Sequence, residues 1–308
     1  MKLIVTGGCG FIGSHFVELA VEKNDHLIII DNLLAGNKDN IKKVMDNGTV
    51  ELVIDDIRNL DNSKLNFSEV DAIVHFAART GVIESLEKPL EFSDVNVIGT
   101  IKLLEICRKF NIPKFVLAST GAVYGNQKAP FSENMIPDPI SPYAASKVSA
   151  ENYCKAYGNT FQILCAVLRF SNVYGPRKSF GPYANVIPKF VRASLRNQPI
   201  TIFGDGLQER DFVFVKDVAH ACYIALEKNT NDVYNIATGK NTSVNKLIDI
   251  LEDTLNYKFQ RNYVEPREGE SKYAYSSIKK AKKELSYSPK FSLVDGLSEY
   301  IEYEKTQL

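Results

Sequence analysis

The sequence predicts an α/β fold: a doubly wound parallel sheet followed by a smaller C-terminal lobe. Two observations lead to this prediction. Short apolar runs rich in β-branched residues recur along the first half of the chain, and segments of helix length separate them. Most of these runs do not alternate apolar and polar residues, which is typical of strands that helices cover on both faces. Strands and helices in this alternation predict right-handed βαβ units that share one sheet.

In chain order, the expected strands of this sheet are residues 3–6, 27–31, 51–54, 72–76, 115–119 and 163–170. After about Asn172 the regular alternation of strands and helices ends, because four prolines and several glycine-containing loops fall within residues 175–206. A further strand, helix and strand are expected at residues 212–215, 217–227 and 233–237, and we expect this passage to return to the sheet. The predicted domains are therefore residues 1–171, with 212–237 returning to them, and a lobe formed mainly by residues 172–308.

The composition narrows the classes of protein and of site. The 37 basic residues balance the 37 acidic ones among 308 residues, whereas proteins that bind nucleic acids or membrane surfaces carry basic patches. No apolar run approaches the roughly 18 to 20 residues that cross a bilayer, and the apolar start breaks at Thr6-Gly7-Gly8, too early for a signal peptide. The five cysteines are scattered, odd in number and form no CxxC pair, which argues against a disulfide framework or a zinc site. We expect a soluble cytoplasmic protein without metal, nucleic-acid or membrane partners.

Four glycines follow the first expected strand directly and open a segment with helical apolar spacing. They match GxGxxG through Gly8, Gly10 and Gly13, and GxxGxxG through Gly7, Gly10 and Gly13. A turn without Cβ atoms lets backbone N–H groups and the helix N-terminus approach a pyrophosphate, although the glycines alone also fit a mere tight turn. Asp31 lies 18 residues beyond Gly13, at the end of the second strand. A carboxylate there accepts hydrogen bonds from both ribose hydroxyls and repels a 2′-phosphate, which favours NAD over NADP.

The segment TGGCGFIGSH at residues 6–15 resembles the fingerprint of the extended short-chain dehydrogenase/reductase family, whose members include nucleotide-sugar epimerases and dehydratases. The resemblance covers residues 1 to about 285. Further matching segments are Asp31-Asn32-Leu33 with Gly36 and Asn40, Asp56-Ile57-Arg58, His75-Phe76-Ala77-Ala78 and Asn96-Val97-Ile98-Gly99-Thr100. Asp55 replaces the glycine that is usual in the adenine-contacting segment.

This resemblance implies a NAD-binding Rossmann domain in residues 1–171 and assigns residues to the cofactor. The positions that match the family's cofactor-binding residues are Gly7, Gly10, Phe11, Ile12, Asp31, Asn32, Asp56, Ile57, Ala77, Ala78, Asn96, Tyr143 and Lys147. NAD is the expected cofactor.

Tyr143 and Lys147 form a YxxxK pair, and Ser141 and Pro142 before them suit a helix cap and a first helical position. On a helix this spacing places both side chains on one face, about one turn apart. A free tyrosine, with a pKa of about 10, is a poor base at neutral pH. We expect the nearby ammonium and the positive ring of oxidised nicotinamide to favour the phenolate, and a shift of roughly three units corresponds to about 4 kcal/mol. YxxxK alone also fits a surface or packing role.

Thr120 stands at the end of the fifth strand, at the edge where ligands meet a parallel sheet. The resemblance assigns its hydroxyl to the reacting sugar oxygen, Tyr143 to the base and Lys147 to the tuning of that base. An ordinary strand-end threonine is the alternative. Family members that dehydrate hexoses carry acidic residues after this threonine, and decarboxylating or GDP-mannose-type members tend to carry a glutamate at the second position. Gly121 and Ala122 occupy these positions here, which leaves an epimerase or a simple redox enzyme.

The C-terminal half resembles the family's nucleotide-sugar lobe. The resemblance implies diphosphate contacts at Asn172, Arg210 and Arg267, and guanidinium forks suit phosphate oxygens. Val186 begins the helix that sits over the nucleotide in the family, and Phe203 matches the aromatic residue next to the base. With Thr120 and Tyr143, these residues form the expected substrate site.

One more position concerns the size of the sugar. In related epimerases a residue beside the hexose C2 group lies seven positions after the second diphosphate arginine, which here leads from Arg267 to Ala274. A small residue there implies room for an N-acetyl group. A one-residue slip in this register would place Tyr273 or Tyr275 at the same point.

The resulting expectation is a nucleotide-sugar 4-epimerase of the UDP-glucose/UDP-galactose kind, which acts through a transient 4-keto sugar with tightly bound NAD. Another NAD-dependent nucleotide-sugar enzyme, a 4,6-dehydratase or a reductase, is the first alternative. A catalytically silent NAD-binding scaffold is the second, because a fold does not fix a function. The nucleotide, and the choice among glucose, N-acetylglucosamine and uronic acid, stay open at this point.

A homodimer is also expected. Related enzymes pair two helices across a two-fold axis into a four-helix bundle, which is an isologous contact. The matching helices are expected to begin near Ser93 and at Pro142. Apolar residues that they carry are Val97, Leu103, Leu104 and Val148.

Overall fold

The computed structural model describes residues 1–60, 65–178, 186–266 and 271–307. It confirms the doubly wound α/β fold, because seven parallel strands form one sheet in the order β11-β6-β5-β4-β1-β2-β3. Their bounds are β1 Lys2–Thr6, β2 His26–Asp31, β3 Val50–Ile54, β4 Ala72–His75, β5 Lys114–Thr120, β6 Leu164–Phe170 and β11 Val233–Ile236. The strand order reverses between β1 and β4, and ligands bind at such a switch point in open α/β sheets.

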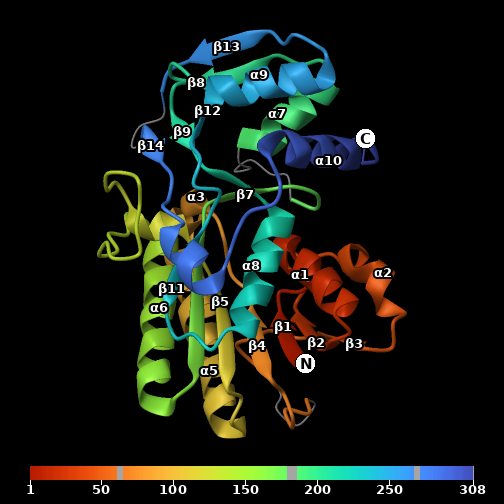
Figure 1. Cartoon of the computed structure of the whole chain (residues 1–308), viewed down its shortest axis with the longest axis vertical. Helices are drawn as coiled ribbons and strands as arrows, with labels where there is room; N and C mark the ends of the chain where they lie inside the picture. The colour runs from red at the N-terminus through yellow and green to blue at the C-terminus, as the bar shows by residue number, and fades with distance from the viewer. Residues whose placement is uncertain (61–64, 179–185, 267–270, 308) are drawn as a thin grey trace.

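Helices cover both faces of this sheet (Figure 1). On one face α1 (Phe11–Glu22) packs against α8 (Val215–Glu227), and on the other α5 (Gly99–Phe110) packs against α6 (Pro142–Phe161). Successive side chains of β1 show the division, because Leu3 and Val5 belong to the core on the α1 and α8 side, whereas Ile4 belongs to the core on the α5 and α6 side. Burial on both faces explains why the sequences of these strands are continuous apolar runs.

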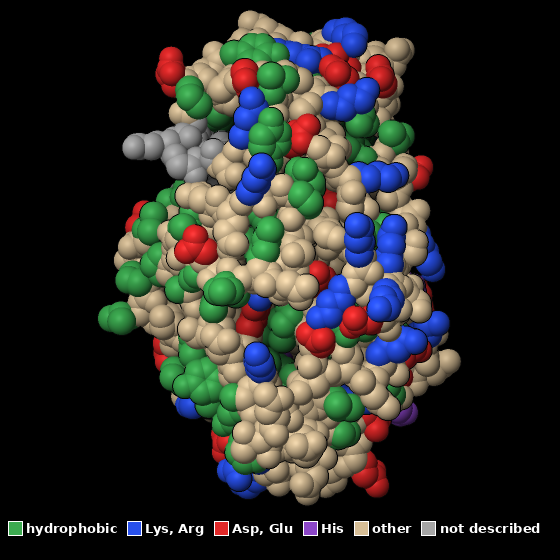
Figure 2. All heavy atoms as spheres, turned by 60° about the vertical axis from the view of Figure 1, so that its left-hand side comes forward, with side chains coloured by type: hydrophobic (Ala, Val, Ile, Leu, Met, Phe, Trp, Pro, Cys, Tyr) green, Lys and Arg blue, Asp and Glu red, His purple; other side chains and the backbone are tan. Residues whose placement is uncertain are grey.

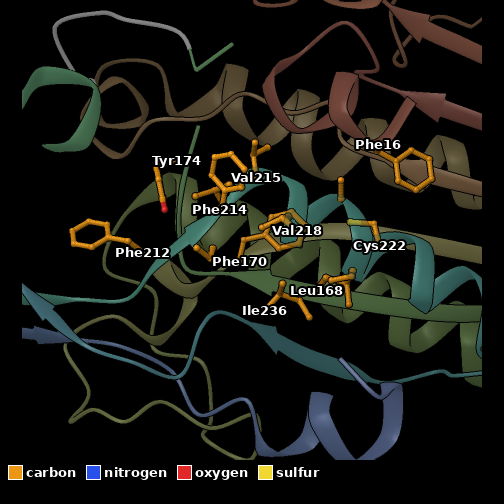
Figure 3. Close-up of a cluster of buried hydrophobic side chains, with 14 of the residues drawn as sticks. Phe16, Leu168, Phe170, Tyr174, Phe212, Phe214, Val215, Val218, Cys222 and Ile236 are labelled. Atoms are coloured by element: carbon orange, nitrogen blue, oxygen red, sulfur yellow. The ribbon is translucent and has the colours of Figure 1, made fainter. Parts of the chain in front are cut away.

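The core on the α1 and α8 side continues beyond the sheet into the second half of the chain. Figure 3 shows Phe170 of β6 close to Phe214 and Val218, which come from a later part of the sequence. The ring of Phe214 lies 5.5 Å from that of Tyr174 and 4.7 Å from that of Phe291, measured between centroids. A shared apolar core therefore joins the sheet to the segments that follow it.

The remaining strands form small sheets apart from the large one, in the upper part of Figure 1. They are β7 Asn172–Tyr174, β8 Ile200–Phe203, β9 Glu209–Arg210, β10 Phe212–Phe214, β12 Thr242–Ser243, β13 Arg261–Val264 and β14 Tyr273–Ala274. The strand β7 pairs with β10, β8 pairs with β13, and β9 lies between β12 and β14. The longer helices of this part are α7 Val186–Leu195, α9 Val244–Leu255 and α10 Leu293–Lys305. In the described ranges, no helix is long and apolar enough to cross a membrane.

The passage at residues 212–237 returns to the large sheet only in part, which differs from the sequence-based expectation. The strand β11 pairs with β6 along four residues, but β10 pairs with β7 in a separate parallel sheet. The reason is the geometry at the end of β6. The edge of β6 that β5 leaves open is occupied by β11, so β10 cannot pair with β6. The strand β7 begins two residues after β6 ends, and β10 pairs with it.

The remaining elements are short helices, and one of them moves the start of the helix that was expected near Ser93. These elements are η1 Lys38–Ile41, α2 Lys42–Met45, α3 Val82–Glu87, α4 Pro89–Ser93, η2 Asp94–Ile98, η3 Gly121–Tyr124 and η4 Ala281–Leu285. The elements α4, η2 and α5 follow one another without a break, so the helix expected near Ser93 begins at Pro89. Proline suits a first helical position because its missing N–H has no partner there.

Two of the four residues named for a dimer contact, Leu103 and Leu104, are placed differently from the expectation, whereas Val97 and Val148 are half-buried. Leu103 and Leu104 are fully buried in the core on the α5 and α6 side, because the apolar stripe of α5 faces the sheet. Val148 packs against a small cluster near η3. The exposed apolar side chains of these helices are instead Leu90 of α4, Ile98 of η2, and Tyr153 and Phe161 of α6.

Candidate active site

The glycine turn after β1 forms a cradle at the switch point of the sheet. Gly7 has a φ of +69°, and a Cβ atom on it would lie 2.6 Å from the backbone nitrogen of Ala77. A Cβ on Gly10 would meet only the Gly7 carbonyl oxygen, at 3.1 Å, so the space beside Gly10 is otherwise open. The helix α1, which begins with Phe11 and Ile12, has no side-chain cap and no acidic residue in its first turn. Its N-terminal N–H groups and partial positive charge therefore suit an anion in this cradle.

Asp31 ends β2 beside this cradle, as the sequence predicts. Its carboxylate accepts hydrogen bonds from the backbone N–H groups of Cys9 and Leu33, each at 2.9 Å. A Cβ atom on Gly36 would lie 2.9 Å from one carboxylate oxygen, so the glycine lets the loop close over Asp31. The carboxylate is thus held in a fixed orientation at the rim of the cradle.

A second polar group lies at the ends of β2 and β3. The Asn32 side chain donates to the Asp56 carboxylate at 2.9 Å. Arg58 also donates to Asp56, and these hydrogen bonds hold the pKa of that carboxyl well below its usual range. Ile57 between them is buried in the core beneath Gly99. The Asp56 carboxylate is therefore ionised and held in a fixed position near the end of β2, which carries Asp31.

Beyond β4 the chain passes Ala77 and Ala78, both half-buried, and is tied to α6. The Asn96 side chain accepts from the backbone N–H of Arg79 at 2.8 Å and donates to the Ser146 hydroxyl at 2.9 Å. Asn96 is almost fully buried. It fixes the loop after β4 against the helix that carries the YxxxK pair.

His75 at the end of β4 has a structural environment. Its two ring nitrogens hydrogen-bond the hydroxyls of Thr6 and Thr100, at 2.7 and 3.0 Å. Burial, together with the charge of Lys147, lowers the pKa of His75 to about 3, so the ring is neutral. Within the described residues, no cluster of three or more His, Cys, Asp or Glu side chains could hold a metal ion.

Thr120, Tyr143 and Lys147 come together where β5 meets α6. Ser141 caps the helix by accepting from the Ala144 N–H at 3.1 Å, and Pro142 is its first residue. Thr120 ends β5, its hydroxyl accepts from the Ala122 N–H at 3.1 Å, and it lies close enough to Tyr143 to lower the pKa of that tyrosine. Lys147 lies one turn further along the helix and is almost fully buried.

The pKa values at this place differ in part from the sequence-based expectation. Burial raises the pKa of Tyr143, and the hydrogen bond to Thr120 opposes that shift. Burial lowers the pKa of Lys147 to about 8, while the charge of Glu151 opposes this shift. The protein alone therefore does not turn Tyr143 into a phenolate. A further positive charge is needed at the site before the tyrosine can ionise near neutral pH.

Two buried groups around this pair are not evident from YxxxK. Ser146 contacts Asn96, and Glu151 forms an ion pair with Arg169 of β6 at 2.6 Å. The available signal for Glu151 is its position four residues after Lys147, which places the two side chains on one helix face. Its partner Arg169 lies on the strand that follows α6, and their pairing has no signal in the sequence because it depends on how the helix docks on that strand.

The residues expected to hold the substrate lie on the small sheets and helix beyond β6. Asn172 begins β7, Val186 begins α7, Phe203 ends β8 and Arg210 ends β9. The side chain of Asn172 donates to the carbonyl of Asp211 at 3.3 Å. Arg267 lies outside the described residues.

Ala274 lies next to Arg210 and to the segment that follows Thr120. In the pairing of β9 with β14 it stands opposite Arg210. Its side chain packs against the cluster of Val123, Tyr124 and Phe131, which follows Thr120 in the chain. Its neighbour Tyr273 is 48% exposed. The small side chain, and not that of Tyr273, therefore faces the segment after Thr120.

Comparison with known proteins gives consistent matches over nearly the whole chain. The family model described as GDP-mannose 4,6 dehydratase matches residues 4–300. A protein of Methanocaldococcus jannaschii named "Putative UDP-glucose 4-epimerase" is 45% identical over 306 residues, which cover 98% of each chain.

Solved structures agree with these matches. The UDP-N-acetylglucosamine 4-epimerase of Methanobrevibacter ruminantium in complex with UDP-N-acetylmuramic acid superposes with a TM-score of 0.96 at 34% identity, covering 100% of this chain and 99% of that one. The UDP-glucuronic acid 4-epimerase of Bacillus cereus in complex with UDP-glucuronic acid and NAD gives a TM-score of 0.92 at 34% identity, with both chains fully covered.

Proposed function

The chain belongs to the GDP-mannose 4,6-dehydratase family within the extended short-chain dehydrogenases/reductases, and on this basis we propose that it is a NAD-dependent nucleotide-sugar 4-epimerase. The observation that carries the proposal is the convergence of Thr120, at the end of β5, with Tyr143 and Lys147 of α6, which lie one helical turn apart. These groups lie at the carboxyl edge of the sheet, next to the glycine cradle. Such a hydroxyl, base and ammonium suit proton transfer to and from a sugar hydroxyl.

The cofactor is NAD, and the residues present fit it. The open space at Gly10 and the uncapped N-terminus of α1 suit the pyrophosphate. Asp31 is fixed where it can accept hydrogen bonds from ribose hydroxyls. We place the adenine side near Asn32, Asp56 and Ile57. The nicotinamide side we assign to the residues nearer Tyr143, which are Ala77, Ala78, Asn96, Tyr143 and Lys147. When bound, NAD supplies a reversible hydride acceptor and a positive ring.

Side chains of the protein accept and return the proton of the sugar hydroxyl. Tyr143 takes the proton of the sugar's 4-hydroxyl and later returns it, while Thr120 keeps the reacting oxygen in line. Because burial raises the pKa of Tyr143, the phenolate requires positive charge nearby. Lys147 supplies one charge and the oxidised cofactor the other. The transient product is a 4-keto sugar, which turns about its diphosphate link and is reduced on its other face.

A 4,6-dehydratase remains the second candidate, since the family model carries that description. Such a reaction removes the C5 proton and protonates the leaving C6 hydroxyl, which requires further acid and base groups. Gly121 and Ala122, at the start of η3, provide none at the positions where the dehydratases carry them. We therefore favour the epimerase.

The substrate is proposed to be a UDP-hexose held by the segments beyond β6. Arg210 and Arg267 would bind the diphosphate together with Asn172, and Val186 and Phe203 would flank the nucleotide. In this division residues 1–171 with 212–237 hold the cofactor, and residues 172–308 mainly hold the nucleotide sugar. The shared core around Phe214 keeps the two parts in a fixed relation.

The direct test is incubation of the purified protein with a panel of UDP- and dTDP-sugars, without added NAD, followed by NMR of the products. Interconversion of C4 epimers supports the proposal. Formation of a stable 4-keto-6-deoxy sugar would support the dehydratase instead. No reaction with any sugar, with NAD retained, would indicate a binding scaffold.

We also propose a homodimer in the cytoplasm. All five cysteines are buried and free, as expected in a reducing compartment. The helices α5 and α6 lie side by side, joined by the hydrogen bond from Tyr157 to Glu105 at 2.7 Å. Tyr153 and Phe161 are 40% and 44% exposed on α6, and hydrophobic side chains also gather on the left of the face in Figure 2. Sedimentation at micromolar concentration should show a dimer, and a monomer there would contradict this assignment.

Replacement of Tyr143 by Phe should lower turnover by about 10²- to 10⁴-fold, because the proton acceptor is lost while the ring still packs. Bound NAD, measured by absorbance after denaturation, should be retained. Thr120→Ala should lose on the order of 10²-fold, since it removes only the alignment of the oxygen. A Tyr143→Phe enzyme that kept a tenth of the wild-type rate would show that Tyr143 is not the base.

Replacement of Asp31 by Ala should weaken NAD binding and relax the discrimination against NADP, because the carboxylate both binds the ribose and repels a 2′-phosphate. Asp39→Ala is the matched control, since Asp39 is an exposed carboxylate on the nearby helix η1. Titration of each cofactor into NAD-depleted protein measures both effects. Equal affinity of the wild-type protein for NAD and NADP would refute the role of Asp31.

Replacement of Ala274 by Tyr should lower the rate with UDP-N-acetylglucosamine and spare the rate with UDP-glucose. A pocket of this kind changes the preference by about 1 to 3 kcal/mol per small group, so the wild-type enzyme should accept both sugars. Tyr273→Ala is the control and should leave the ratio of the two rates unchanged, because Tyr273 is exposed. If the two rates moved together in Ala274→Tyr, Ala274 would not border the sugar.

A further inference from the structure

A row of polar side chains crosses the large sheet next to Thr120. Ser119 of β5 stands opposite Arg169 of β6, and Arg169 stands opposite Asn235 of β11. All three are at most 4% exposed. Buried polar groups need partners, and here the partners come from the helix above and from the turn after β5.

Glu151 of α6 is the helix partner of this row. Its carboxylate accepts from the Ser119 hydroxyl and from two nitrogens of Arg169, with the Nη2 atom at 2.6 Å and the Nε atom at 3.0 and 3.2 Å from the two oxygens. This two-pronged ion pair fixes both the position and the orientation of the carboxylate. It joins α6 to β5 and β6 at the level of the residue before Thr120.

The turn after β5 supplies the other partners. The Arg169 guanidinium lies 4.8 Å from the ring centroid of Tyr124 and donates to its hydroxyl at 2.9 Å. That hydroxyl donates in turn to the Asn235 side chain at 2.7 Å. Thr120 therefore sits between two anchored residues, with Ser119 before it and Tyr124 after it.

Stability alone does not explain this arrangement. Moving two charges out of water offsets most of the attraction between them, and apolar residues of similar volume often replace such pairs without loss. The position of Glu151 indicates a role in the site, because it lies one turn after Lys147 on the same helix. The other titratable groups facing Lys147 are His75, which is neutral, Tyr143, and the thiol of Cys154.

We propose that Glu151 is a positioning residue of the epimerase site: paired with Arg169 and Ser119, its carboxylate ties α6 to the strand that ends in Thr120 and stands one turn from the Lys147 ammonium. This inference rests on the proposed function for its kinetic consequence. Its structural part concerns Lys147 alone and can be measured without turnover.

The sign of the effect follows from the burial of Lys147. Burial disfavours the ammonium and lowers the pKa of Lys147 to about 8, and the negative charge of Glu151 opposes that decrease. Without the carboxylate the pKa of Lys147 should fall further. The lysine would then lose its charge at a lower pH, and activity would decline on the alkaline side at a lower pH than in the wild-type enzyme.

The test is the double variant Glu151→Gln with Arg169→Met, which removes both charges together and leaves no unpaired ion in the core. With lysine labelled by ¹³C at Cε, NMR follows the titration of Lys147, identified as the signal missing in Lys147→Arg. We expect a titration near pH 8 in the wild-type protein and a lower pKa of Lys147 in the double variant; Glu151→Gln alone, which leaves the positive charge of Arg169 in place, should lower it further. The alkaline limb of the kcat profile should move in the same direction.

Two further variants keep the result decisive. Glu151→Asp retains the charge and should leave the titration of Lys147 close to that of the wild type, even where the double variant folds poorly. Glu252→Gln with Arg261→Met removes another buried pair, between α9 and β13, and should leave both readouts unchanged. A Lys147 titration that is the same in wild type and double variant would overturn the inference. If Lys147 shifts but the wild-type protein epimerises no sugar, the proposed function fails and the pairing with Glu151 stands.

Discussion

The docking of α6 on the ends of β5 and β6 is the interaction on which the site depends. This helix carries both Tyr143 and Lys147, and their use requires that the helix meet the strand that ends in Thr120. Ser146 bonds to Asn96 at one level of the helix, and Glu151 bonds to Ser119 and Arg169 at another. Between these two anchors the helix has little freedom to slide or turn. The closeness of Thr120 to Tyr143 follows from that fixed position.

The same edge of the sheet also receives the cofactor, because the strand order reverses there. The glycine turn can come close to the end of β4 only without a side chain at Gly7, and α1 then points its N-terminus into the crevice. In the proposed function, proton transfer at Tyr143 and hydride transfer to NAD would thus take place at neighbouring strand ends. The electrostatics of the two are linked, since the ionisation of a buried Tyr143 requires a positive charge that the protein alone does not fully provide.

Much of this could be predicted from the sequence, because the signals are local. Continuous apolar runs located the strands of the large sheet to within a residue, and spacing placed Asp31, Thr120, Tyr143 and Lys147 at strand ends and on one helix face. What local signals could not provide were pairings between distant segments. The partner of β10 depends on which edge β11 occupies, and the ion pair of Glu151 with Arg169 depends on how α6 docks on the strand that follows it. The burial of Leu103 depends likewise on which face of α5 meets the sheet.

If the proposed function is correct, the hydrogen taken from C4 of the sugar returns to the same carbon, because NAD, when bound, would supply a reversible hydride acceptor. This central claim is tested most directly with UDP-glucose that carries deuterium at C4, converted without added NAD and analysed by NMR and mass spectrometry. The account predicts UDP-galactose that retains the deuterium at C4, with none taken from or lost to water. Loss of the label, or its appearance at C6 of a deoxy sugar, would contradict it.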